Sequence, residues 1–238
     1  MKLTVIIPVY NERQTFAEIM QRVVRVPLFK EIIVVDDGSN DGTRELLSQY
    51  VNQPNIKVIF HKSNLGKGHA IRTGLAEASG EIVVIQDADL EYDPEDFVEM
   101  IKPIRNGQTA VVYGSRRLKK ENKSYSGWIY YIGGLTVTYL ACFLYRISIT
   151  DEATCYKMMD TALLRSLNLT CERFEFCPEV TAKLALLDIP ILEVPISYYP
   201  RNKSEGKKIG WRDAVEAIWT LLKLKLSPVK IKTTRGEC

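Results

Sequence analysis

The sequence predicts an α/β fold in which a Rossmann-like, doubly wound and mainly parallel sheet carries helices on both faces. In the first 115 residues, short apolar runs alternate with helical patterns, as expected for repeated strand–helix–strand crossovers. The apolar runs are continuous, which is typical of strands that are covered on both faces. Polar residues follow several of these runs directly, at the edge where open α/β sheets bind their ligands.

Five runs rich in β-branched residues predict the strands, and four periodic segments between them predict the helices. The predicted strands are residues 3–8, 31–36, 56–60, 82–86 and 110–113, and the helices are about 15–25, 43–51, 66–78 and 94–105. Asp93 before Pro94 supplies a cap and a first-turn proline, and Gly80 follows a helix. Beyond residue 115 we expect helices at about 161–167 and 175–187, a strand pair at 189–200 and an amphipathic helix at about 211–226.

Length and composition narrow the class of protein. With 238 residues, 46% hydrophobic and 26% charged, the chain can bury a large core, as one α/β domain or two small ones. The net charge of +3 implies no strong attraction to nucleic acid, so no nucleic-acid partner is expected. Five cysteines without a CxxC pair favour reduced thiols in the cytosol. The first apolar run is too short for the core of a signal peptide, so we predict a strand there.

A stretch of 22 residues, 124–145, contains no charged side chain. Its length would suffice to cross a bilayer, which takes about 20 apolar residues. Gly133 and Gly134 interrupt the stretch, and its tyrosines and Trp128 suit a membrane surface. An interfacial helix, a helix packed in the interior and a true span all stay open. The last 18 residues carry five cations against Glu237, and each cation contributes about 1 kcal/mol near anionic lipid. A membrane surface is therefore an expected partner.

The most concentrated charge follows the fourth predicted strand. Residues 87 to 96 include six carboxylates, which repel one another unless water or a cation screens them. They belong either to a solvated helix start or to a site that holds positive charge. The sequence has no GxGxxG and no GxxxxGK[ST] motif, so phosphates would be held through a metal ion. Asp87 and Asp89, on either side of the small Ala88, offer the carboxylate ligands that Mg²⁺ and Mn²⁺ prefer.

The second and third predicted strands also end in polar segments. Asp37 lies in DDGSNDGT, which is a good helix-capping turn as well as a candidate ligand site. Gly66 and Gly68 after the third strand would let the backbone approach a ligand. Lys67 between them is expected to be exposed rather than bound. His61 and His69 lie too far along the chain from other metal-ligand residues to indicate a zinc site.

Five motifs follow one another in an informative order. They are VIIPVYNE, VVDDGSNDGT, NLGKGHAIRTG, DADLEYDPE and YGSRR. In this order they resemble glycosyltransferase family 2, enzymes with the A-type glycosyltransferase fold, and the resemblance extends from residue 3 to about residue 210. Within the family the chain is most similar to the polyprenyl-phosphate sugar transferases, typified by dolichyl-phosphate mannose synthase.

The resemblance implies a role for each motif residue. Around the nucleobase and ribose of a nucleotide sugar it places Pro8, Tyr10, Glu12, Val35 and Asp37. Around the sugar and the diphosphate it places Asp87, Ala88 and Asp89, with Asp87, Asp89 and Glu91 as ligands of Mg²⁺ or Mn²⁺. Phosphate-binding cations would be Arg116 and, in a loop that closes over the site, Arg201, Lys203 and Lys207. The catalytic residues would be Asp89, Asp151, Arg116 and Arg201.

On the acceptor side, the segment TDEATCYK resembles the family's acceptor-site motif. The matching positions are Thr150, Asp151, Thr154 and Lys157, with Cys155 and Tyr156 where the motif has Gly-Phe, and Glu179 stands where the family shares an acid. Some of these enzymes carry a basic residue for the lipid phosphate in the stretch that corresponds to 124–145, which has none here. The candidates to replace it are Arg117, Lys119, Lys120, Lys123 and Arg146.

The implied reaction moves a hexose, mannose or glucose, from a GDP- or UDP-sugar to dolichyl or undecaprenyl phosphate, with inversion at the anomeric carbon. Residues 1–115 would form the nucleotide-sugar-binding half, 116–210 the membrane-facing helical acceptor half, and 211–238 an amphipathic helix with a basic tail. A phosphate acceptor is already ionised near pH 7 and needs no strong base. We expect a cytoplasmic protein that binds the cytosolic face of a membrane peripherally, with a small membrane-anchor subunit as a further candidate partner.

Three other functions stay open at this point. A transferase of the same fold could act on a saccharide or protein hydroxyl, and Asp151 would then be the natural base. A non-catalytic nucleotide-sugar-binding subunit is disfavoured by the intact Asp87 and Asp89. A nucleotidyltransferase is disfavoured because no Gly-rich triphosphate loop follows the first strand.

Overall fold

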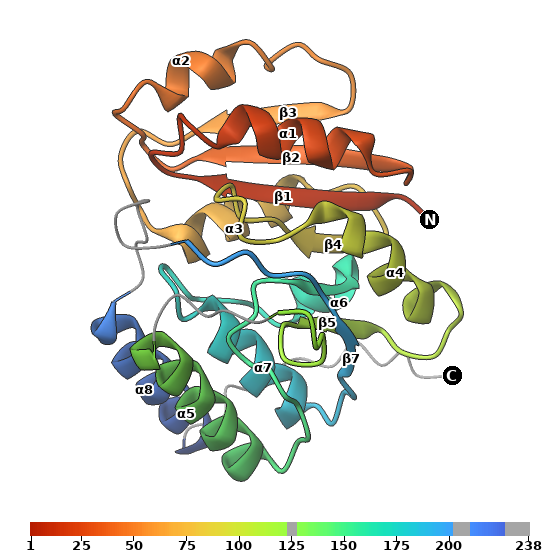
Figure 1. Ribbon diagram of the computed structural model, residues 1–238, viewed down its shortest axis with the longest axis vertical. Coiled ribbons are helices and arrows are strands. Elements are labelled where there is room, and N and C mark those ends of the chain that lie inside the picture. The colour runs from red at the N-terminus through yellow and green to blue at the C-terminus, as the bar shows by residue number, and fades with distance from the viewer. Residues whose placement is uncertain (123–127, 202–209, 227–238) are drawn as a thin grey trace.

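The computed structural model describes residues 1–122, 128–201 and 210–226. Seven strands in this part of the chain form one sheet, in the order β3-β2-β1-β4-β6-β5-β7 (Figure 1). The strands are β1 Leu3–Val9, β2 Lys30–Asp36, β3 Ile56–Phe60, β4 Ile82–Ile85, β5 Val111–Ser115, β6 Lys157–Asp160 and β7 Leu192–Pro195. The helices are α1 Phe16–Arg25, α2 Thr43–Ser48, α3 Lys67–Glu77, the 3₁₀ helix η1 Pro94–Asp96, α4 Phe97–Arg105, α5 Trp128–Tyr145, α6 Thr161–Ser166, α7 Phe176–Leu186 and α8 Trp211–Leu226.

The sheet reverses its direction of winding beside β1. This strand pairs in parallel with both β2 and β4, so that Val5 lies between Ile32 and Val84. The chain first winds outward to β3 and then returns to add β4 on the other side of β1. The predicted doubly wound, mainly parallel sheet is confirmed. Ligands bind at such a reversal because the two crossovers leave in opposite directions and open a crevice at the carboxyl ends of the strands.

Beyond residue 115 one strand was not predicted, and the predicted strand pair was wrong in part. β6 was missed because its four residues carry a lysine and no β-branched side chain. It pairs antiparallel with both β4 and β5. The buried Lys157 amine donates to the carbonyls of Glu152 and Thr154, at 2.6 and 2.8 Å, which offsets the cost of burying it. Only β7 forms from the predicted pair at 189–200, and Tyr198 makes just an isolated bridge to Tyr92.

Residues 128–145 of the uncharged stretch form α5, which packs against α8 and α7 in a cluster separate from the main core (Figure 1). Val137 and Ala141 of α5 and Leu221 of α8 are buried in this cluster. The Tyr145 hydroxyl donates to the Leu221 carbonyl at 2.7 Å and ties the two helices together. Over the residues that the structure describes, no helix is both long and apolar enough to cross a bilayer. One face of α5 is therefore packed, and its other face stays exposed.

Candidate active site

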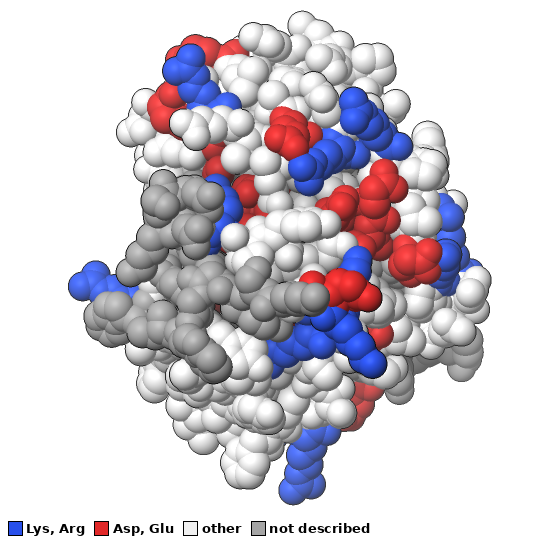
Figure 2. Space-filling model, in the orientation of Figure 1, with Lys and Arg blue, Asp and Glu red and all other residues white. Residues whose placement is uncertain are grey.

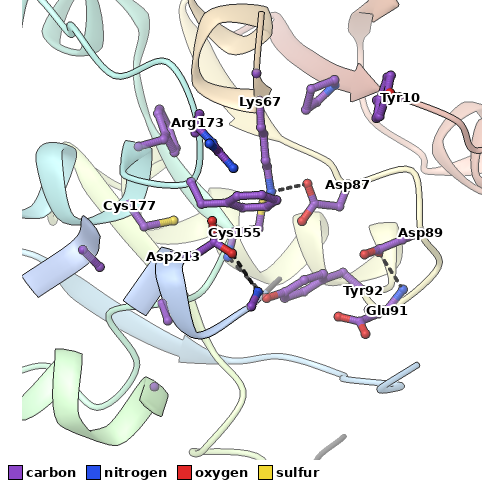
Figure 3. A pocket seen from close by; sticks show the side chains of 18 of the residues that line it. Tyr10, Lys67, Asp87, Asp89, Glu91, Tyr92, Cys155, Arg173, Cys177 and Asp213 are labelled. Atoms are coloured by element: carbon purple, nitrogen blue, oxygen red, sulfur yellow. Dashed lines mark hydrogen bonds and ion pairs between the residues drawn. The ribbon is translucent and has the colours of Figure 1, made fainter. Parts of the chain in front are cut away.

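A pocket of about 1120 Å³ opens at the carboxyl ends of the parallel strands (Figure 3). It gathers loops that follow β1, β2, β4 and β5 with the start of α3, the segment before α7, and parts of α5 and α8. Many of the residues predicted for the site line this pocket: Pro8, Tyr10, Glu12, Asp37, Asp87, Ala88, Asp89, Glu91, Arg116 and Arg201. Segments that lie nearly 200 residues apart in the sequence therefore meet in one cavity.

The acidic turn after β4 places two carboxylates side by side. Leu90 has a φ of +63°, in the left-handed region, and this turns the backbone so that Glu91 follows Asp89 closely. The Glu91 amide donates to Asp89 Oδ1 at 3.1 Å. The second carboxylate is fixed from the far side of the pocket, because Glu91 Oε2 accepts from the Tyr198 hydroxyl at 3.2 Å.

Arg201 supplies the positive charge that this acidic turn requires. Its Nη1 lies 3.2 Å from Glu12 Oε2, and its Nη2 lies 3.2 Å from Asp89 Oδ2. Its backbone amide donates to Glu91 Oε1 at 2.8 Å. Burial, together with the charges of Asp87 and Glu91, raises the pKa of Asp89 to about 7, against the opposing effect of Arg201. Negative charge thus remains in excess at this turn, and an added cation would relieve it.

Lys67 neutralises the other carboxylate of the turn, so the expectation of an exposed lysine was wrong. Its amine lies 2.6 Å from Asp87 Oδ1, and its side chain is only 20% exposed. Figure 3 shows the side chain reaching from α3 to Asp87, with Cys155 beside it; the amine lies 3.4 Å from the Cys155 sulfur. Burial opposes the charged amine, but Asp87 outweighs it and holds the pKa of Lys67 well above its ordinary value.

The backbone of Gly66 and Gly68 packs closely against the segment that precedes α7, and Gly66 also lines the pocket. A Cβ at Gly66 would lie 2.3 Å from the Glu172 carbonyl, and one at Gly68 would lie 2.9 Å from the Arg173 carbonyl. The Gly68 amide donates to that Arg173 carbonyl at 2.9 Å. Glycine is needed here so that α3 can begin close enough for Lys67 to reach Asp87.

The donor set fits a divalent cation bound by two carboxylates. Among the described residues, no group of three or more His, Cys, Asp or Glu side chains is arranged to hold a metal ion. Asp87, the third predicted ligand, is paired with Lys67 at 2.6 Å. Mg²⁺ commonly takes only one or two protein carboxylates and completes its shell with water and substrate phosphates. The adjacent carboxylates of Asp89 and Glu91 match that pattern.

Asp151 lies behind the pocket and holds Arg116. The guanidinium donates through Nε to Asp151 Oδ2 and through Nη2 to Oδ1, both at 2.7 Å. The Arg116 amide adds a third hydrogen bond at 3.0 Å. Burial favours a high pKa for Asp151, but Arg116 overcomes this and the pKa falls below its ordinary value. With 0% of its side chain exposed, Asp151 holds Arg116 from the interior of the protein.

The other predicted residues either make contacts within the protein or lie outside the described part of the chain. Asp37 lines the pocket but accepts from the amides of Leu65 and Gly66, at 3.0 and 2.8 Å, and so fixes the loop before α3. Val35 is fully buried within β2 and does not line the pocket. Lys203 and Lys207 lie outside the described residues.

Most of the acceptor-motif positions are buried. The Lys157 amine lies 4.1 Å from the centre of the Tyr113 ring. Thr150 is exposed, and its Oγ1 lies 2.6 Å from Ser115 Oγ. Glu179 accepts from the Cys171 amide at 2.7 Å and pairs with Lys183 at 2.6 Å, so this acid braces the start and body of α7.

α5 and α8 line a second part of the pocket, which we call the groove between α5 and α8. Most of its lining residues are small or apolar, namely Gly133, Gly134, Val137, Ala214 and Ala217, and Tyr131 and Asp213 line it as well. The sequence predicted an acceptor half here but no groove. Arg117, one of five cations that the sequence offered for the lipid phosphate, lines the same pocket. The periodicity of small residues on two helices distant in sequence was the only available signal.

The fold as a whole identifies the class of protein. The chain superposes on glucosyl-3-phosphoglycerate synthase of Mycobacterium tuberculosis, solved with Mn²⁺, UDP and phosphoglyceric acid, with a TM-score of 0.71 at 21% identity. The match covers 96% of this chain and 80% of that one. The fold is that of the A-type glycosyltransferases.

The sequence then gives the family. Residues 4–167 match glycosyl transferase family 2, and the chain belongs to this family. It is 31% identical to dolichol-phosphate mannosyltransferase of Pyrococcus furiosus over 217 residues, which is 88% of this chain and 60% of that protein. It is 30% identical to dolichyl-phosphate beta-glucosyltransferase ALG5C of Trichomonas vaginalis, over 87% of this chain and 66% of that one. The chain thus spans about two thirds or less of these two relatives.

Proposed function

We propose that the chain transfers a hexose from a nucleotide sugar to a polyprenyl phosphate, with inversion of the anomeric carbon. The observation that carries this proposal is the single pocket, which joins a carboxylate end to a groove of small apolar residues between α5 and α8. The first end suits a charged diphosphate and the groove suits a hydrocarbon chain. Relatives whose names include dolichol-phosphate mannosyltransferase and dolichyl-phosphate beta-glucosyltransferase support mannose or glucose as the sugar.

At the donor end, Pro8, Tyr10 and Asp37 would surround the nucleoside of a GDP- or UDP-sugar, because they line the pocket beyond the acidic turn. Asp89 and Glu91 would hold Mg²⁺ or Mn²⁺. The bound ion would supply positive charge to the leaving diphosphate. Arg201, 3.2 Å from Asp89, lies at the same place and would stabilise the same charge.

The acceptor would attack without help from a base. A phosphate monoester is ionised near pH 7, since its second pKa is about 6. The geometry suits this chemistry because Asp151, the base expected for a hydroxyl acceptor, has both oxygens bound to Arg116. The role of Asp151 would be to hold the Arg116 guanidinium toward the phosphates.

One observation favours a hydroxyl acceptor as the second candidate. Glu152 lines the pocket, is buried, and accepts from Thr181 Oγ1 at 3.1 Å. Burial raises its pKa, and a carboxylate of raised pKa can act as a general base. Transfer to a saccharide hydroxyl that is lost in Glu152→Gln would favour this alternative.

The proposed function is tested by following the sugar. The full chain with Mn²⁺, undecaprenyl phosphate and radiolabelled GDP-mannose or UDP-glucose is expected to move label into an organic extract. Undecaprenol, which lacks the phosphate, is the matched control and should accept none. Label that enters only water-soluble saccharides, or none in either phase, would contradict the proposal.

The exposed faces of α5 and α8 would seat the enzyme on a membrane. Phe143 of α5 and Trp219 of α8 are 81% and 64% exposed, and Tyr139 of α5 and Leu226 of α8 are exposed as well. Figure 2 shows mostly uncharged atoms over this end of the molecule. Lys223 and Lys225 are exposed on α8 and would meet anionic headgroups. The groove between these helices would then open toward the lipid, at the cytosolic face of the membrane.

Membrane binding can be tested with matched apolar substitutions. The double variant Phe143→Ser/Trp219→Ser is expected to bind anionic phosphatidylglycerol vesicles at least about tenfold more weakly, because two large side chains no longer enter the interface. Co-sedimentation measures the binding. Phe29→Ser removes a side chain that is 68% exposed elsewhere and should have no effect. Equal losses of vesicle binding in both variants, or no loss in either, would contradict membrane binding through α5 and α8. A membrane-anchor subunit would then be the remaining candidate partner for these exposed faces.

A further inference from the structure

The groove between α5 and α8 needs a cation for the phosphate of the acceptor, and α5 supplies none. From Trp128 to Tyr145 this helix has no lysine or arginine. We propose that Arg117, from the loop after β5, binds the phosphate monoester of the acceptor. This inference rests on the proposed function, and it names the residue by which this chain would recognise the charged end of the lipid.

The guanidinium of Arg117 reaches over α5 from outside the helix. Its central carbon lies 5.6 Å from the centre of the Tyr131 ring. A Cβ at Gly134 would lie 3.5 Å from Arg117 Nη2, so the guanidinium rests against the small-residue face that forms the groove. Arg117 itself lines the pocket. A cation from the loop thus lies against α5, which has no lysine or arginine of its own.

Arg117 is also open to a ligand. Its Nε is buried and has no hydrogen-bond partner, and its guanidinium makes no hydrogen bond or ion pair with any described residue. Buried donors are nearly always paired, because an unpaired one loses its hydration without compensation. A phosphate can accept two parallel hydrogen bonds from one guanidinium, so it matches this unsatisfied group.

The neighbouring Arg116 shows the contrast. It is held bidentately by Asp151, and its guanidinium lies 5.1 Å from the centre of the Tyr198 ring, on the side of the acidic turn. Consecutive arginines therefore point to the two ends of the pocket, with the fixed one toward the donor and the open one toward the groove. A phosphate acceptor placed between them would have its charge next to the reacting carbon and its chain in the groove.

The other candidate cations fit less well. Lys119 donates to Ser197 Oγ at 2.5 Å, and Lys120 is exposed. Arg146 follows the last residue of α5, so it lies about 18 Å along the helix axis from Gly134, at 1.5 Å per residue. The side chain of Lys123 lies outside the described part of the chain. Among the described candidates, Arg117 alone lines the pocket.

The test compares Arg117→Gln with Lys120→Gln, an equal loss of charge on an exposed side chain of the same loop. Arg117→Gln is expected to raise the KM for polyprenyl phosphate about tenfold to a hundredfold, the effect of one lost charge-assisted pair. The KM for the nucleotide sugar and the melting temperature should not change. Lys120→Gln should have the KM of the wild type. Arg117→Lys keeps the charge but cannot donate two parallel hydrogen bonds, so its KM should lie between those of the wild type and Arg117→Gln.

A binding measurement separates this inference from the function itself. Equilibrium dialysis of the UDP-loaded chain with farnesyl phosphate, farnesol and inorganic phosphate is expected to show binding of farnesyl phosphate that Arg117→Gln weakens. Equal binding or equal KM in Arg117→Gln and Lys120→Gln would overturn the role of Arg117 and leave the function standing. Transfer that fails while Arg117-dependent binding persists would overturn only the function. Absence of both transfer and binding in the wild type would overturn both.

Discussion

Asp89→Ala is expected to abolish metal-dependent nucleotide binding and to slow hexose transfer about a thousandfold or more. Asp89 is one of two adjacent carboxylates in the acidic turn, and Arg201 contacts it directly. Its loss would remove one of the two carboxylates proposed to hold the cation and also one anchor of Arg201. Both effects would reduce the stabilisation of the negative charge that develops on the leaving diphosphate. Their contributions to the activation free energy should therefore add.

Calorimetric titration with GDP and UDP, each with and without Mn²⁺, measures the effect of Asp89→Ala and also shows which base the site prefers. Glu95→Gln is the control, because Glu95 is an exposed carboxylate in the same acidic stretch. The control should bind the nucleotide as the wild type does. If Asp89→Ala still bound it with unchanged metal dependence, Asp89 and Glu91 would not be the metal site.

Asp151→Asn is expected to lower the free energy of unfolding by about 3–5 kcal/mol, the typical cost of breaking a buried ion pair from one side. Arg116 would keep its charge, with a side chain only 16% exposed, and would lose its bidentate partner. Transfer should fall as well, because the guanidinium would no longer be oriented. Chemical denaturation followed by circular dichroism measures the stability.

The double variant Arg116→Met/Asp151→Leu separates the two effects. It removes both charges, so most of the stability should return while transfer stays low. The pH dependence has a definite sign. The pKa of Asp151 is lower in the folded chain, so its contribution is complete above its ordinary pKa of about 4 and disappears as the pH falls through the folded value. The wild type and Asp151→Asn should therefore converge at low pH. A constant difference between them would contradict the ion pair as the source.

The first half of the fold could be predicted because its signals are local. Continuous apolar runs such as Val83–Val84 mark strands covered on both faces, and the helices between them have a clear period. β6 gave no such signal, because its pairing depends on where β4 and β5 already lie. The strand pair predicted at 189–200 likewise failed, because the chain is irregular after Pro195. Only β7 and an isolated bridge form there.

The motif residues of the site could be predicted, but their partners could not. Asp87 and Asp89 stand at a strand end, where sequence position alone places them in the crevice. Arg201 contacts Glu12 across 189 positions of sequence, and no local pattern reports such a contact. Lys67 resembled a surface lysine because its burial depends on the packing of Gly66 against the Glu172 carbonyl.

The internal cations of the acidic turn change what a measured affinity for the donor means. Arg201 and Lys67 already compensate part of the negative charge before any ligand arrives. Under the proposed function, binding would therefore be an exchange, in which the incoming metal diphosphate would replace existing ion pairs. The observed free energy would then be only the difference between two sets of contacts. The same exchange would run in reverse after transfer, when the returning arginine would compete with the product diphosphate and help to release it.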